Sequence, residues 1–162
     1  METSLFRDRD FRLVAGSVGL SALGDWVAIV ALGLFIGDQT DSGFLVAALW
    51  ICLFGPSVVV SGFAGMLVDR VETTRLLALV SVAGTAVAVV LAFVSGVALA
   101  LVLTALLGVV FAIAQPAEFA LVPPLAGSRI QEANGHVETV RYLGYGIGPL
   151  VGGFLYSWGG LE

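Results

Sequence analysis

The chain has 162 residues, of which 59 % are hydrophobic and only 12 % are charged. Soluble domains are typically about 45–50 % apolar and about a quarter charged, so a soluble core of this size could not bury so many apolar side chains. All seven basic residues are arginines, the formal net charge is −5, and no basic patch of the kind that nucleic acid requires is present. Composition therefore predicts an integral membrane protein and no nucleic-acid partner.

The long apolar runs predict membrane-spanning helices. They are too long for barrel strands, and they do not alternate between apolar and polar residues. The first span is expected at about residues 11–36, after a polar start at residues 1–10. It is longer than the hydrophobic region of a signal peptide, about 7–15 residues, and it contains Asp25, so we expect an uncleaved first span.

A second span is expected at about residues 43–68, and the charged segment Gly65–Arg75 lies at its end. Residues 76–114 contain no charge. As one helix they would extend about 58 Å, roughly twice the thickness of the hydrocarbon core. This run must therefore turn back, and Ser95-Gly96 is the obvious turn.

The turn at Ser95-Gly96 gives third and fourth spans at about residues 76–94 and 97–117, and a fifth is expected at about residues 135–158. Residues 118–134 are expected to form a polar connector, because prolines and a glycine that break helices fall just before or within it: Pro116, Pro123, Pro124 and Gly127. The fold class is therefore all-α integral membrane, with five transmembrane helices in one incomplete domain, residues 1–162.

The arginines predict the orientation of the chain. The turns at residues 37–42 and 95–96 contain no basic residue, whereas the alternate connections contain Arg7, Arg9, Arg12, Arg70, Arg75 and Arg129. By the positive-inside rule the N-terminus, Gly65–Arg75 and the 118–134 connector are cytoplasmic. We expect a multi-pass protein of the cell membrane, plasma or inner, in contact with the lipid bilayer.

Asp25 lies near the middle of the first span, in Gly24-Asp25-Trp26. A carboxylate at the bilayer centre costs about 2.5–3.5 kcal/mol on insertion scales, so it is expected to face a cavity or a partner rather than lipid. It is a candidate cavity acid that takes up a proton or contacts a cationic group. The alternative is a structural hydrogen-bond acceptor between helices.

Arg141 lies one turn inside the fifth span, three residues after Glu138, which places both side chains on one helix face. An internal ion pair near the cytoplasmic interface is the simplest interpretation, and snorkelling of Arg141 to the headgroups is the alternative. His136 is expected to be part of the polar rim.

The fifth span is rich in glycine and contains Pro149. At 100° per residue, Gly144, Gly148 and Gly152 form one stripe. Gly135, Gly146 and Gly153 lie near the opposite side, which predicts close helix packing on both faces.

Two motifs resemble those of the major facilitator superfamily. Gly65-x-Leu67-x-Asp69-Arg70, between the second and third spans, resembles the superfamily's loop signature. The fifth span is similar to the "antiporter" motif of its exporters at Gly135, Gly144, Gly148, Pro149, Gly152 and Gly153. The start of the chain, Phe6–Leu13, together with Gly24-Asp25-Trp26 and Asn134, resembles the branch that contains the enterobactin exporter and related drug-efflux carriers.

The sequence departs from the family pattern at two places. Glu72, Thr73 and Thr74 stand where the loop signature usually continues with a glycine and two basic residues, and Arg75 follows. Thr104 stands where many proton-coupled exporters have an arginine. Asp25 is then the remaining central ionisable candidate for coupling.

The resemblance implies most of the N-terminal six-helix half of a major facilitator fold. It implies part of a secondary active transporter that exports small hydrophobic or amphipathic molecules, of drug or siderophore type, by alternating access and ion-coupled antiport. Asp69, Arg70 and Arg75 would form a cytoplasmic latch with Gly65, and further C-terminal helices or a partner chain would supply the other half. Arg141 lies within the fifth-helix motif.

The alternative function is a truncated or accessory small membrane protein without transport activity of its own. The sequence contains no nucleophile–base set, metal-ligand cluster or phosphate-binding loop. We therefore expect no enzyme activity, no cofactor and no metal. Reading the coding sequence beyond Glu162 would distinguish the two interpretations.

Overall fold

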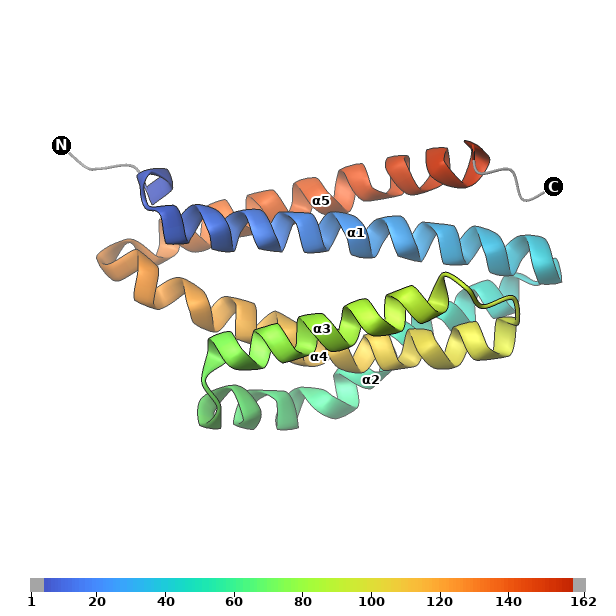
Figure 1. The fold of residues 1–162 in the computed structure, drawn as a ribbon, viewed down its shortest axis with the longest axis horizontal. Helices are drawn as coiled ribbons and strands as arrows, with labels where there is room; N and C mark the ends of the chain where they lie inside the picture. Colours follow the sequence, from blue (N-terminus) through green and yellow to red (C-terminus); the bar gives the residue numbers. More distant parts are fainter. Residues whose placement is uncertain (1–4, 159–162) are drawn as a thin grey trace. The chain divides into compact units, whose positions relative to one another are not determined.

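The computed structural model describes residues 5–158, which are almost entirely helical (Figure 1). The helices are η1 (Leu5–Arg7), α1 (Arg9–Thr40), α2 (Gly43–Arg70), α3 (Thr73–Leu91), α4 (Val97–Ala126), η2 (Gly127–Arg129) and α5 (Ile130–Trp158), where η denotes a 3-10 helix. The predicted all-helical class is correct. The chain divides into two compact units, Met1–Leu34 with Leu121–Glu162 (unit 1) and Phe35–Ala120 (unit 2).

Within residues 5–158, four helical stretches are long and apolar enough to cross a membrane. Three of them are α1, α2 and α3. The fourth, Val97–Trp158, joins α4, η2 and α5 into 62 residues, whereas one span needs only about 20. Length and composition thus give four candidate spans where the sequence predicted five. The 3-10 turn η2 is the point at which the fourth stretch would divide into two.

The predicted polar connector at residues 118–134 is wrong. Helix α4 continues to Ala126 and α5 begins at Ile130, so only η2 separates them. The prolines are tolerated because a proline φ of about −65° fits a helix, and each proline removes only one backbone donor. Gly127 ends α4 with a φ of 54°, a left-handed conformation that a residue without Cβ adopts at no steric cost.

The predicted spans fall on these helices, but their ends differ. Helix α1 continues past residue 36 to Thr40, whose hydroxyl donates a hydrogen bond to the Ile36 carbonyl at 2.6 Å. Asp41, directly after the end of the helix, has a φ of 49°. Helix α3 begins three residues earlier than predicted and ends at Leu91, so the chain turns at residues 92–96. The turn region contains the predicted Ser95-Gly96.

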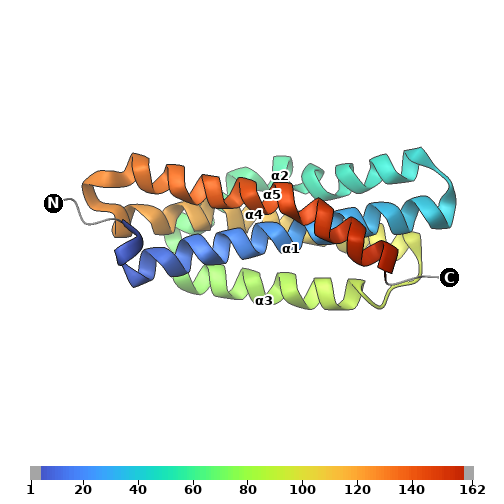
Figure 2. The same ribbon diagram turned by 90° about the horizontal axis from the view of Figure 1, so that it is seen from above.

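Unit 1 is built around α1 and α5, which lie side by side in both ribbon views (Figures 1 and 2). Its core also takes in the start of the chain and the end of α4. The buried side chains are Leu5, Phe11, Ala15, Val18, Val122, Ala126, Ala133 and Val137. Small residues are frequent in this core, which allows helix backbones to approach closely.

Unit 2 packs α3 against α2 and α4. Leu76, Val80 and Ala117 form its buried centre, with Val68, Leu77, Val110, Ile113 and Ala114 packed around them. Thr104 of α4 is only 1 % exposed, and its hydroxyl donates to the Ala100 carbonyl at 2.8 Å. This intrahelical bond satisfies the hydroxyl, so a polar residue is accommodated in an apolar helix.

Candidate functional site

One glycine stripe of α5 packs directly on α1. A Cβ atom at Gly144 would lie 2.8 Å from the backbone nitrogen of Leu23, and one at Gly148 would lie 2.9 Å from the Leu23 carbonyl oxygen. At Gly152 it would lie 2.8 Å from the Val27 carbonyl oxygen. Real Cβ atoms do not approach this closely, so a larger residue at any of these positions would force α1 and α5 apart. The sequence predicted this stripe, and the structure places it against α1.

The opposite glycines of α5 have no such neighbour. Within the described chain, a Cβ at Gly135, Gly146 or Gly153 would meet no atom within 4 Å. The close helix approach expected on this second face is therefore absent among residues 5–158. Leu143, Ile147 and Leu150 on α5 are exposed as well, so much of α5 away from α1 is open.

Asp25 is half-buried on α1, and it accepts a long hydrogen bond of 3.4 Å from the Ser21 hydroxyl one turn earlier. The neighbouring Trp26 ring lies 5.4 Å from the ring of Tyr145 on α5, and Tyr145 makes an edge contact with Tyr142 at 5.7 Å. The α1–α5 pair therefore carries an acid beside an aromatic cluster within its apolar spans.

Arg141 is buried, with 5 % of its surface exposed, and its Nε donates to Glu138 Oε1 at 3.0 Å. The predicted internal ion pair is present. A charge in an apolar span requires such a partner, because water is not available to solvate it. Glu138 thus balances the charge of Arg141.

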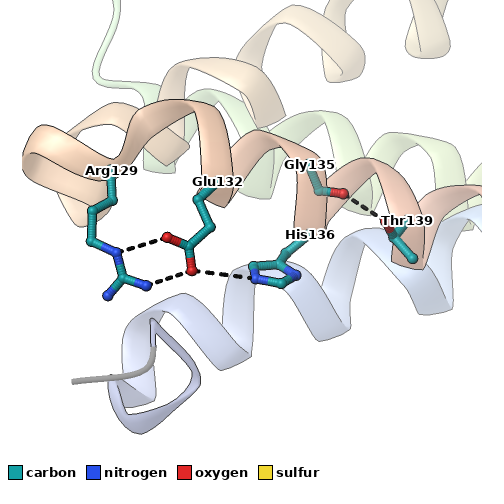
Figure 3. Close-up of polar contacts among 5 residues, drawn as sticks. All are labelled: Arg129, Glu132, Gly135, His136 and Thr139. Atoms are coloured by element: carbon teal, nitrogen blue, oxygen red, sulfur yellow. Dashed lines mark hydrogen bonds and ion pairs between the residues drawn. The ribbon is translucent and has the colours of Figure 1, made fainter. Parts of the chain in front are cut away.

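A polar cluster marks the start of α5 (Figure 3). Arg129 Nε donates to Glu132 Oε2 at 2.9 Å, and His136 Nε2 lies 3.6 Å from Glu132 Oε1. The His136 ring also meets the edge of Phe6 at 4.9 Å between centroids. The predicted rim histidine therefore contacts the start of the chain, where Phe6 also packs against Phe11.

The predicted loop signature lies mostly on helices. Gly65, Asp69 and Arg70 are exposed on the last turns of α2, and Arg75 lies in the first turn of α3. Arg75 Nε pairs with Glu72 at 2.7 Å. Helix α2 continues through Pro56 to Arg70, so only a two-residue link separates it from α3.

Gly108 is a packing residue that the sequence reasoning did not identify. A Cβ there would overlap the Leu53 carbonyl oxygen and would lie 2.9 Å from the Cys52 carbonyl oxygen, so α4 crosses α2 in direct backbone contact. An isolated glycine inside an apolar helix is the signal that could have found it.

Within residues 5–158, no group of three or more histidine, cysteine, aspartate or glutamate side chains could hold a metal ion. Cys52 is free and half-buried. The long apolar helices, the closely packed helix pairs and the charged residues inside the spans define a multi-pass helical membrane protein.

A family model described as Major Facilitator Superfamily matches residues 14–162. The chain therefore belongs to the Major Facilitator Superfamily, whose members are transporters rather than enzymes. No curated protein matches the chain, and no solved structure does so either. The family predicted from the two motifs is thus confirmed, and the resemblance to the enterobactin-exporter branch remains a prediction.

Proposed function

We propose that the chain is the N-terminal part of a secondary exporter of small hydrophobic or amphipathic molecules, with ion-coupled antiport by alternating access. In this proposal α4 and α5 each cross the cell membrane, which gives five spans with the N-terminus in the cytoplasm. Further helices, from the same reading frame or from a partner chain, complete the substrate cavity.

The packing of α5 on α1 carries this proposal. The glycines that contact the α1 backbone, Gly144, Gly148 and Gly152, are the ones that form a stripe in the exporter motif. Backbone contact at three successive turns favours a stiff pair of α1 and α5, because backbone atoms cannot change rotamer as a long side chain can. A stiff pair moves as one body, as rocking of one half against the other requires.

Asp25 is the coupling candidate in this pair. Three charged residues of the α1 and α5 spans matter here: Asp25, Glu138 and Arg141. Glu138 neutralises Arg141 at 3.0 Å, so of the three Asp25 carries the remaining negative charge. Ionisable residues within membrane spans commonly mark substrate or proton paths. Proton uptake and release at Asp25 would then alternate with binding of the transported molecule.

Asp69, Arg70 and Arg75 form the cytoplasmic latch in this proposal. All three are exposed at the ends of α2 and α3, where helices of a second half can reach them. Gly65 lies one turn before Asp69, and a Cβ there would meet nothing within 4 Å among the described residues. A helix of the second half could therefore approach the α2 backbone at Gly65.

The test replaces Asp25 by Asn in the complete carrier, encoded by the full reading frame, in proteoliposomes with an imposed pH gradient. Efflux of fluorescent amphipathic dyes should fall to near background, while the amount of inserted protein stays unchanged. Asp41→Asn is the matched control. Asp41 is exposed beyond the end of α1, and asparagine tolerates its φ of 49°.

If Asp25→Asn exports dye at the level of the unmodified carrier, Asp25 is not needed for coupling and its role is structural. Absence of dye movement by the unmodified carrier, under any gradient, would favour the alternative of an accessory membrane protein. A stop codon directly after Glu162, with no neighbouring frame that encodes further helices, would also contradict the proposal and favour the accessory protein.

A further inference from the structure

An open apolar groove runs along the last third of α2, within unit 2. It has a volume of about 270 Å³, and its lining consists of Val60, Phe63, Ala64, Met66, Leu67, Arg70 and Ile113. Compact ligands usually occupy enclosed pockets of about 300–1,000 Å³ that contain several polar groups. This groove has a single polar residue, at one end, so it suits an extended apolar chain with a charged head.

The length of the groove matches one leaflet of a bilayer. Val60 and Arg70 are ten residues apart on α2, which corresponds to about 15 Å at about 1.5 Å per residue. The hydrocarbon core of a bilayer is about 30 Å thick, so the groove spans about half of it. Phe63 is 68 % exposed and Met66 is 49 % exposed, and both are available to contact an acyl chain.

The guanidinium of Arg70, at the end of the groove, is available to bind a lipid headgroup. Arg75 pairs with Glu72 at 2.7 Å, whereas Arg70 makes no hydrogen bond or ion pair within the part of the chain that the structure describes. A guanidinium binds phosphate oxygens through two parallel hydrogen bonds. Arg70 is the last residue of the apolar helix α2, so in an inserted chain it would lie near the membrane–water interface, where the lipid phosphates are.

We propose that this groove binds an anionic phospholipid, with one acyl chain along Val60, Phe63 and Leu67 and the headgroup phosphate at Arg70. The inference needs only insertion of the chain in a membrane, so it does not depend on transport. A guanidinium that binds lipid phosphate cannot at the same moment contact a second half of the carrier, so bound lipid would compete with the latch at Arg70.

The test measures lipid binding to the purified chain by native mass spectrometry, with phosphatidylglycerol and phosphatidylcholine of identical acyl chains as probes. We expect phosphatidylglycerol to bind more tightly, and Arg70→Gln to weaken its binding about tenfold, as loss of a charge-assisted hydrogen bond does. Arg70→Lys should retain most of the preference. Arg75→Gln, which removes the neighbouring exposed arginine that is paired with Glu72, should leave binding unchanged.

The apolar part of the groove is tested separately. Val60→Trp fills the groove and should weaken binding of both lipids, whereas Val59→Trp, at a 75 % exposed position outside the lining, should not. An undiminished phosphatidylglycerol preference in Arg70→Gln would overturn the proposal, as would normal binding in Val60→Trp. A Cys52→Ser, Phe63→Cys variant tests whether a second copy covers the groove. If it forms disulfide-linked dimers, and added phosphatidylglycerol does not lower their amount, a second copy of the chain occupies the groove and the proposal is wrong.

Discussion

Substitution of Gly144 by alanine adds one methyl group at a close contact between α1 and α5. The new Cβ would lie 2.8 Å from the Leu23 nitrogen, 2.9 Å from the Ala22 Cβ and 2.9 Å from the Gly19 carbonyl oxygen. Two of these three atoms belong to the backbone, which cannot relieve the overlap by a change of rotamer as a flexible side chain can. The helices must therefore separate by a few tenths of an ångström.

Overpacking of this kind typically costs about 1–3 kcal/mol. Replacement of a helical glycine by alanine also stabilises the helix by about 0.5–1 kcal/mol, because glycine loses more backbone entropy on folding. Gly146→Ala is the matched control, since a Cβ at Gly146 meets nothing within 4 Å in the described chain. Both substitutions gain the same helix propensity, so their difference in stability isolates the packing cost, about 1–3 kcal/mol.

Gly144 is preferable to Gly148 for this comparison. Gly148 precedes Pro149, and a Cβ on the residue before a proline disfavours the helical conformation for a separate reason. The assay is unfolding in mixed micelles by titration with sodium dodecyl sulfate, followed by circular dichroism. Gly144→Ala should shift the midpoint to lower detergent fraction, and Gly146→Ala should shift it slightly upward. Equal midpoints for the two variants would refute the close packing of α5 on α1.

Two further outcomes are expected in the same assay. Gly108→Ala should destabilise the chain by at least as much as Gly144→Ala, because its Cβ would overlap the Leu53 carbonyl oxygen. Gly62→Ala is the control and should not destabilise the chain, since Gly62 lies in open space among the described residues. Equal stability of Gly108→Ala and Gly62→Ala would contradict the α2–α4 contact. Arg141→Met should cost about 1–3 kcal/mol because it leaves the half-buried Glu138 without its cation. Addition of Glu138→Gln should recover most of this loss, and a double-mutant cycle with no coupling would show that the ion pair contributes nothing.

The sequence alone was sufficient for the class and for much of the candidate site. An apolar fraction of 59 % permits only a membrane protein, and the absence of alternation permits only helices. Sequence spacing also placed Glu138 and Arg141 on one face, because a helix fixes the angle between residues three apart. The same periodicity separated the α5 glycines into two opposite faces.

Helix ends were less predictable. The prolines at 116, 123 and 124 were expected to break α4, yet the helix continues to Ala126. A proline removes one backbone hydrogen bond and its φ of about −65° fits a helix, so a proline in a helical segment does not by itself mark where the helix ends. The second helix ends at Arg70 rather than at residue 68 and the third begins at Thr73 rather than at residue 76, so the loop signature lies mostly on helices.

Periodicity within one helix cannot say which neighbour lies against each face, and only the tertiary structure decided that. It placed Gly144, Gly148 and Gly152 against α1 and left Gly135, Gly146 and Gly153 open within residues 5–158. It also brought α4 onto α2 at Gly108 and formed the groove that ends at Arg70. These contacts join residues far apart in the sequence, and they depend on the shapes of two helix surfaces together, which no single segment contains.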